Sequence, residues 1–294
     1  MAAVLHCGAF VEQGRNMNER TGSPVVAFIG GGNMASSLVG GMVARGGDPS
    51  RIRVADRNAP NRERLCASFG VQCFATPEEA VDGADFWVLA VKPQGMRLVC
   101  NDLAPLAQQV RPVAVSVAAG ITSRQVADWL GGAVPVVRAM PNTPSLLGAG
   151  MTGLYANEHV EEHQRAQAGE LLAAVGEVEW IADEALMDAV TGVSGSGPAY
   201  LFLMAEAMAD AGAAQGLPRD VAARLANQTI LGAARMLVES GEDAATLRRR
   251  VTSPGGTTQA GLEAFEEGGL RALVERAVGA ATRRGAELSA ANED

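Results

Sequence analysis

Short apolar runs separated by helix-like segments fill the first two thirds of the chain. Most of these runs are rich in Val, Ala, Leu or Ile, which is typical of buried strands. Strands that alternate with helices in this way predict an α/β fold with a doubly wound sheet between about Pro24 and Ala182. The predicted strands cover 25–29, 51–55, 73–74, 85–91, 113–117, 135–139 and 150–155.

The pattern changes after Glu184, where strand-like runs give way to helical ones. A segment from Ala199 to Gly216 is apolar on nearly every face of a helix, which predicts that it is buried on all sides. A helical domain of about 110 residues has little interior for such a helix, so we expect a second copy of the chain to cover it. A last amphipathic helix is predicted from about Gly269 to Leu288.

The first predicted strand runs directly into a glycine-rich turn. Gly30, Gly32 and Ala35 have the spacing of a dinucleotide-binding turn between a strand and a helix. The first glycine allows the tight turn, the second lets the backbone approach a pyrophosphate, and the alanine permits close helix packing. The alternative, a glycine turn without a ligand, is disfavoured by the strand, turn and helix order. We expect the cofactor phosphates on Gly30, Gly31, Gly32, Asn33, Met34 and Ala35.

Charged residues follow the second predicted strand. In a dinucleotide-binding unit, an acid at this place suits the ribose 2′-hydroxyl of NAD, whereas Arg suits the 2′-phosphate of NADP. Asp56 and Arg57 stand side by side, followed by Asn58, so these residues leave NADPH and NADH open. A charged loop without a ligand is the alternative interpretation.

Two further segments follow predicted strands at the edge where ligands bind in open α/β sheets. Lys92 and Pro93 end the strand 85–91, and the small residues Ala118 and Ala119 follow the strand 113–117. A second glycine loop, TSPGGTT at 252–258, precedes a predicted helix and offers N–H groups and hydroxyls to an anion such as a carboxylate. A simple helix–helix connection is the alternative for that loop.

Composition restricts the function classes. The 294 residues suffice for two domains, and 48% apolar with 19% charged residues is ordinary for a soluble protein. The net charge of −9 argues against a nucleic-acid surface, and no apolar run is long enough to span a membrane. Residues 1–22 lack the features of a secretory signal and are interpreted as a flexible N-terminal extension.

Cysteine and histidine usage indicates neither a disulfide framework nor a metal site. The four cysteines form no CxxC pair and are predicted to be reduced, mostly buried thiols of a cytoplasmic protein. They are Cys7, Cys66, Cys73 and Cys100. His159 and His163 are four residues apart, but the segment is strongly polar, so a solvated helix face is preferred over a metal site.

Six phrases together resemble the pyrroline-5-carboxylate reductase family. They are FIGGGNMA at 28–35, LAVKP at 89–93, AAGI at 118–121, RAMPNTP at 138–144, DAVTGVSGSGPAY at 188–200 and SPGGTT at 253–258. The resemblance covers nearly everything from Val25 onward. It implies a Rossmann domain at 23–182 and a helical dimerisation and substrate-binding domain at 183–294. It also implies reduction of L-1-pyrroline-5-carboxylate to L-proline by NAD(P)H, the last step of proline biosynthesis.

The resemblance also implies roles for particular residues. The nicotinamide would meet Ala90, Val91, Lys92, Pro93, Val117, Ala118 and Ala119, and the adenosine end Asp56, Arg57 and Asn58. The substrate would contact Glu184, Ser253, Gly255, Gly256, Thr257 and Thr258. The family supplies that last loop from a second subunit, which implies a homodimer or a higher homo-oligomer such as a decamer. Pro77 and Arg250 stand where the family often has Asn.

A mechanism follows from the chemistry of a cyclic imine that carries a carboxylate. Once its nitrogen is protonated, the C=N carbon accepts a hydride without a covalent nucleophile or a metal. We expect backbone N–H groups of Gly255 to Thr257 to hold the carboxylate, and Thr258 to act as the catalytic residue at the ring nitrogen. The alternatives are a reductase for another small imine or hydroxyacid, and a dinucleotide-sensing protein without turnover. The intact SPGG loop and Thr258 disfavour the sensing protein.

Overall fold

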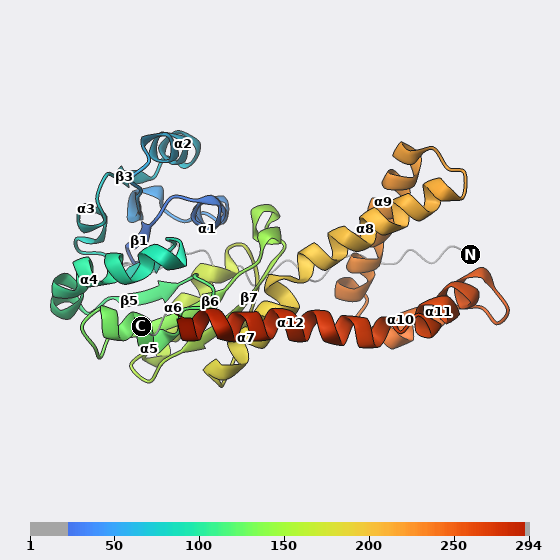
Figure 1. Ribbon diagram of the computed structural model, residues 1–294. Coiled ribbons are helices and arrows are strands. Elements are labelled where there is room, and N and C mark those ends of the chain that lie inside the picture. Colours follow the sequence, from blue (N-terminus) through green and yellow to red (C-terminus); the bar gives the residue numbers. More distant parts are fainter. Residues whose placement is uncertain (1–22, 292–294) are drawn as a thin grey trace, which may run out of the picture.

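The computed structural model describes residues 23–291, so the interpretation of residues 1–22 and the state of Cys7 lie outside the described residues. Figure 1 shows an α/β body at one end and a long helical arm at the other. The body is built on one sheet of eight strands in the order β3-β2-β1-β4-β5-β6-β7-β8. The strands are β1 (Val26–Ile29), β2 (Ile52–Ala55), β3 (Gln72–Phe74), β4 (Phe86–Leu89), β5 (Val113–Ser116), β6 (Val136–Met140), β7 (Gly150–Ala156) and β8 (Gly176–Trp180).

This sheet confirms the predicted doubly wound α/β fold. All seven predicted strands are present, and neighbouring strands are parallel except β7, which runs antiparallel to β6. The eighth strand, β8, was not predicted from the sequence. Its sequence GEVEW alternates acidic residues, which are exposed, with half-buried apolar ones, so it lacks the continuous apolar run of the central strands.

The two faces of the sheet are covered by different helices. Val26 and Phe28 of β1 pack in one core, whereas Ala27 and Ile29 pack in the other, because successive strand side chains point to opposite faces. The first core contains residues of α1 (Asn33–Ala44), α2 (Ala59–Phe69) and α6 (Glu162–Ala173). The second contains residues of α3 (Pro77–Val81), α4 (Pro93–Val110) and α5 (Ser123–Trp129). Short 3-10 turns at η2 (Pro49–Arg51) and η3 (Thr143–Leu147) complete the body.

The arm begins after β8 and returns to the body at its end. η4 (Glu184–Leu186), α7 (Met187–Val190) and the π-helical turn η5 (Thr191–Gly195) connect the sheet to α8 (Gly197–Ala214). There follow α9 (Arg219–Glu239), α10 (Ala244–Arg250), α11 (Thr257–Glu267) and α12 (Leu270–Ala291). α12 runs back along the molecule, so its C-terminal end lies beside α5 (Figure 1).

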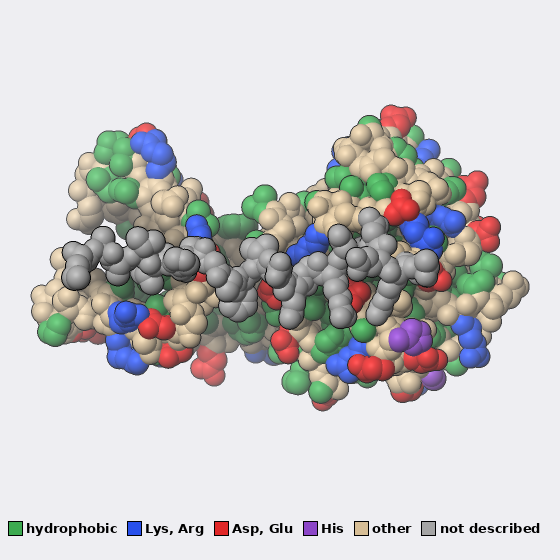
Figure 2. Space-filling view, turned by 180° about the vertical axis from the view of Figure 1, so that it is seen from behind, with side chains coloured by type: hydrophobic (Ala, Val, Ile, Leu, Met, Phe, Trp, Pro, Cys, Tyr) green, Lys and Arg blue, Asp and Glu red, His purple; other side chains and the backbone are tan. Residues whose placement is uncertain are grey.

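The arm has almost no core of its own within one protomer. Its described core cluster consists of Ala209, Ala222 and Ala226, all of them small. Within one protomer the Ala199 helix is not buried on all sides, since α8 exposes Leu201 and Phe202 by 54% and 67%. Figure 2 shows hydrophobic side chains on the surface of the arm. This exposed apolar face is what a second copy of the chain would have to cover.

The prediction that all four cysteines are reduced thiols is wrong for one pair. Cys66 and Cys73 are joined by a disulfide, with Cα atoms 6.3 Å apart. The pairing arises because Gly70 adopts the left-handed conformation at the end of α2 and turns the chain back into β3. Cys100 is a buried free thiol, and burial raises its pKa to about 12.

Packing of α1 against the end of α6 makes Gly41 a sensitive position. A Cβ atom there would lie 2.6 Å from the Ala174 carbonyl oxygen. We expect Gly41→Ala to destabilise the protein by about 1–3 kcal/mol through overpacking. Thermal unfolding at a fixed protein concentration measures this. The control is Gly95→Ala in α4, where a Cβ meets no atom within 4 Å and the change should stabilise by about 0.5–1 kcal/mol. Equal shifts for both variants would contradict the close contact.

Candidate active site

The glycine turn after β1 has the geometry that a dinucleotide requires. Gly30 has a φ of 105°, and a Cβ there would lie 2.6 Å from the Ala90 carbonyl oxygen, so only glycine fits. Gly32 caps α1, and a Cβ on it would meet no atom within 4 Å, which leaves open space above the helix start. The first turn of α1 carries no acidic residue. An anion placed there meets the positive end of the helix dipole.

The Asp56 carboxylate stabilises this turn by hydrogen bonds. One carboxylate oxygen accepts hydrogen bonds from the Gly31 N–H at 2.7 Å and from Asn61 Nδ2 at 3.2 Å. The other accepts from the Asn58 N–H at 2.7 Å. Both oxygens are therefore engaged by protein donors, and a contact of this acid with the cofactor's ribose stays a prediction.

A pocket of about 310 Å³ opens beside Asp56, with Arg57 at its wall. Ala75, Pro77 and Val99 supply apolar surface, the exposed Arg57 supplies a cation, and the lining also includes the acidic residues Glu78 and Asp102. Thr76 forms a capping box with Glu79 at the start of α3. Thr76 and Pro77, which differ from the family pattern, thus start helix α3, and Pro77 gives the pocket an apolar wall. An apolar wall suits the flat ring of a nucleotide base.

The remaining cofactor candidates lie at the carboxyl edge of the same sheet. Five residues are in register across five neighbouring strands, namely Ala55, Ile29, Leu89, Ser116 and Arg138. The first four are the last residues of their strands, whereas Arg138 lies in the middle of β6. The predicted segments 30–35, 56–58, 90–93 and 117–119 follow these four residues, so the fold brings them to one edge. Lys92 caps α4 and is exposed, and Ala118 is buried.

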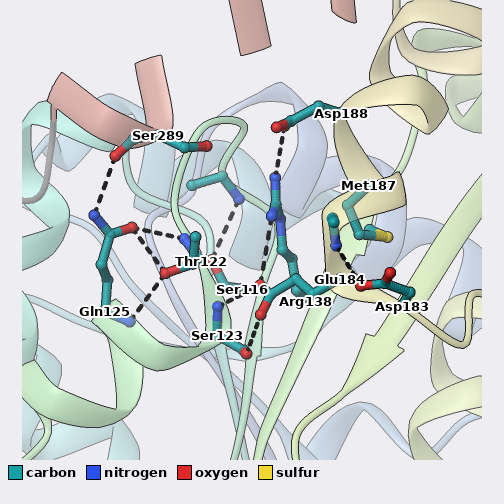
Figure 3. A network of polar contacts seen from close by, with 12 residues as sticks. Ser116, Thr122, Ser123, Gln125, Arg138, Asp183, Glu184, Met187, Asp188 and Ser289 are labelled. Carbon is teal, nitrogen blue, oxygen red and sulfur yellow. Dashed lines mark hydrogen bonds and ion pairs between the residues drawn. The ribbon is translucent and has the colours of Figure 1, made fainter. Parts of the chain in front are cut away.

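Glu184 lies in a network of polar contacts between the body and the arm (Figure 3). Its carboxylate accepts hydrogen bonds from the Ser123 N–H and the Ser123 hydroxyl, both at 2.6 Å. Arg138 Nη1 lies 3.4 Å from the same carboxylate, and Arg138 Nη2 lies 3.1 Å from Asp188. Burial, followed by the charge of Glu184, raises the pKa of Tyr155, which pairs with Arg138 across β6 and β7.

Arg138 and Ser123 were not predicted as site residues. A usable signal was present for Arg138, because it interrupts the apolar strand VVRAM and its side chain is only 5% exposed. A buried Arg requires an acidic partner. Ser123 carried no signal, because its partner Glu184 is 61 residues away in sequence.

The loop with Ser253, Gly255 and Gly256 lies between α10 and α11, at the end of the arm far from the glycine turn (Figure 1). Two of the N–H groups expected to hold the carboxylate have partners within the described protomer. The Gly255 N–H donates to Gln259 at 2.8 Å, and the Gly256 N–H donates to the Ser253 carbonyl at 3.0 Å. These two N–H groups are therefore already used.

Thr257 and Thr258 remain the available groups of this loop. They are the first two residues of α11, and both are exposed. Among the contacts of residues 23–291, none engages either hydroxyl. Arg250, the second departure from the family pattern, pairs with Glu242 at 2.5 Å. Within one protomer the threonines and the sheet edge do not meet.

The described residues contain no group of three His, Cys, Asp or Glu side chains able to hold a metal ion. None of the described helices combines the length and apolarity needed to cross a bilayer. The glycine turn, the pocket and the aligned strand ends are features of a dinucleotide site. Together with the arm, they define an NAD(P)-dependent oxidoreductase with a helical dimerisation domain.

Comparisons with known proteins identify the family. A model of pyrroline-5-carboxylate reductase dimerisation matches residues 184–288, and a model of F420-dependent NADP oxidoreductases matches residues 25–120. The chain is 52% identical to pyrroline-5-carboxylate reductase of Pseudomonas aeruginosa, over 91% of this chain and 97% of that protein. It is 44% identical to the Arabidopsis thaliana enzyme, over 90% and 95%. The chain belongs to the pyrroline-5-carboxylate reductase family.

Solved structures agree with this assignment. The reductase from Coxiella burnetii superimposes with a TM-score of 0.88 at 42% identity, covering 90% of this chain and 98% of that one. A Plasmodium falciparum pyrroline carboxylate reductase with NADP bound gives a TM-score of 0.79 at 28% identity, covering 91% and 99%. Both the α/β body and the arm are therefore shared with reductases of this family.

Two variants test whether Asp56 stabilises the glycine turn or recognises the cofactor's ribose. Asp56→Ala removes the acceptor of the Gly31 N–H, so we expect it to weaken binding of NADPH and NADH alike, by about tenfold. Arg57→Ala is the matched variant and should weaken NADPH binding alone, because only NADPH carries a 2′-phosphate. Fluorescence titration with each nucleotide measures both effects. Selective loss of NADH affinity in Asp56→Ala would show that this acid binds the ribose instead.

Proposed function

We propose that this protein reduces L-1-pyrroline-5-carboxylate to L-proline with NADPH, the last step of proline biosynthesis, and that NADH can replace NADPH. The observation that carries the proposal is the 52% identity to the Pseudomonas aeruginosa reductase along 97% of its length. The described sheet edge and the complete SPGGTT loop supply the two halves of the site that this reaction needs.

The residues at the sheet edge fit a nicotinamide dinucleotide. Gly30 to Ala35 would cradle the pyrophosphate, Arg57 and Asn58 would meet the 2′-phosphate, and the pocket walled by Pro77 would take the adenine. Ala90 to Pro93 and Val117 to Ala119 would line the nicotinamide. When bound, the nicotinamide supplies the hydride that the C=N carbon of the substrate accepts.

The threonines of α11 fit the other half of the reaction. We assign the substrate carboxylate to the start of α11, where Thr257 contributes its N–H and hydroxyl, and the ring nitrogen to the Thr258 hydroxyl. Ser253 and the two glycines shape this loop. Holding the imine at near-attack distance supplies several kcal/mol of rate enhancement, about 7–11 at most. Orientation, and not a covalent nucleophile, is therefore the contribution of these residues.

The protein is proposed to work as a homodimer or as a higher homo-oligomer such as a decamer. The match to a dimerisation domain and the exposed apolar face of α8 support association of copies. Because Thr258 lies far from the sheet edge of its own protomer, each site would combine the cofactor of one copy with the loop of another. We also propose that the two domains divide between residues 182 and 183 and that the protein is cytoplasmic. The net charge of −9 supports the further proposal that it has no nucleic-acid partner.

Initial rates with pyrroline-5-carboxylate and each cofactor test the reaction. We expect oxidation of NADPH at 340 nm to depend on the substrate, and Thr258→Ala to lower kcat/KM about 10- to 100-fold, since a hydrogen bond to a charged group is lost. Ser240→Ala, at the exposed end of α9, is the control and should retain the wild-type rate. Unchanged kinetics of Thr258→Ala would remove the role assigned to its hydroxyl.

Mixed dimers test whether the site is shared between copies. One protomer carries Gly32→Val, which blocks the cofactor, and the other carries Thr258→Ala. If the loop acts on the neighbouring copy, one of the two sites remains intact, so the mixed dimer should recover up to about half of the wild-type activity, although each parent is impaired. A mixed dimer no more active than its parents would show that each site uses its own loop.

A further inference from the structure

The segment between β5 and α5 is held from the arm side at two points. It contains Val117, Ala118 and Ala119, which the proposed function places against the nicotinamide, and it leads into Ser123, the first residue of α5. Glu184, the first residue of η4, accepts the N–H and the hydroxyl of Ser123 at 2.6 Å each. Both oxygens of one carboxylate are thus engaged at the start of α5.

The second point of contact comes from the end of α12. A Cβ on Gly120 would lie 2.9 Å from the Leu288 Cβ, so α12 packs directly on the turn of this segment. Gln125 Nε2 donates to the Ser289 carbonyl at 3.2 Å, and both residues are buried. Figure 3 shows Gln125 and Ser289 on one side of the network and Glu184 with Arg138 on the other.

Arg138 fixes the position of Glu184. Its side chain is 5% exposed and bridges Glu184 at 3.4 Å to Asp188 at 3.1 Å. Its Cα, in the middle of β6, is in register with Ser116, the last residue of β5, so the side chain starts level with the edge of the sheet where the 117–122 segment begins. A buried guanidinium between two carboxylates restrains both, because moving either one leaves a charge unpaired. The start of the arm is thereby tied to the sheet edge.

We propose that Ser123 and Arg138 are positioning residues for hydride transfer. Through Glu184 they hold the 117–122 segment in place beneath the nicotinamide and set the direction in which the arm leaves the sheet. The inference rests on the proposed function, since it requires a nicotinamide at Val117 to Ala119. It also gives Glu184 a role that does not depend on contact with the substrate.

This arrangement matters because the site has to be assembled from two copies. The Thr257 and Thr258 loop is carried at the end of the arm, so a small rotation where the arm joins the body moves that loop by a larger distance. Misplacement of about 1 Å at reacting atoms can cost about 100-fold in rate. Loss of the Ser123 hydroxyl should therefore lower turnover more than it weakens binding.

Ser123→Ala is the test variant. We expect kcat to fall about five- to tenfold while the KM values for pyrroline-5-carboxylate and NADPH stay within about twofold, because orientation and not ground-state binding is lost. In the protein without cofactor, hydrogen–deuterium exchange of the 117–122 segment should rise. Arg124→Ala is the matched control on the same helix, since Arg124 and Asp128 form a pair with exposures of 89% and 64%, and it should change neither quantity.

A double-mutant cycle with Glu184→Ala, which removes both acceptors of Ser123, tests whether Ser123 acts through Glu184. If it does, Ser123→Ala adds little to the loss already present in Glu184→Ala. If the two substitutions lower kcat by independent factors that multiply, the proposal is overturned. An unchanged kcat in Ser123→Ala would also overturn it, even if exchange of the 117–122 segment becomes faster. If the wild-type protein does not reduce pyrroline-5-carboxylate, the proposed function fails. Unchanged exchange in Ser123→Ala would then separately overturn the restraint of the segment.

Discussion

The helical arm cannot bury its own apolar residues, and the organisation of the molecule follows from that constraint. α8 exposes Leu201 and Phe202, and the described core of the arm is limited to three alanines. Exposed apolar area of this kind is stabilised when a second copy covers it. The match to a dimerisation domain fits this physical requirement. A shared site then becomes possible, because the arm carries the loop with Thr257 and Thr258 away from its own sheet.

Alignment of strand ends determines the other half of the site. The parallel register brings the ends of β2, β1, β4 and β5 into one row, so loops that are far apart in sequence lie at one edge of the sheet. Within that row, residue type alone does not define a role. Asp56 has the position of a ribose-binding acid, yet its carboxylate accepts hydrogen bonds from the N–H groups of Gly31 and Asn58. Arg57, the next residue, is exposed at the wall of the neighbouring pocket.

Body and arm are connected by a polar network around the buried Arg138. Ser123, Arg138, Glu184 and Asp188 come from α5, β6, η4 and α7, and their contacts join the sheet edge to the start of the arm. Such a network favours one arrangement of its parts, because any other leaves a buried charge unpaired. The connection between the two halves of the site is thus more specific than apolar packing alone would make it.

The sequence by itself determined the elements that depend on local pattern. Apolar runs predicted seven strands, and glycine spacing predicted the turn at Gly30, because tight turns and buried strands restrict residue type locally. Contacts between distant residues decided the rest. β8 was missed because its acids face solvent, the Cys66–Cys73 pairing depends on how α2 turns into β3, and the engagement of Glu184 depends on a serine 61 residues away. Only the tertiary structure could bring these partners together, since no local pattern records a long-range contact.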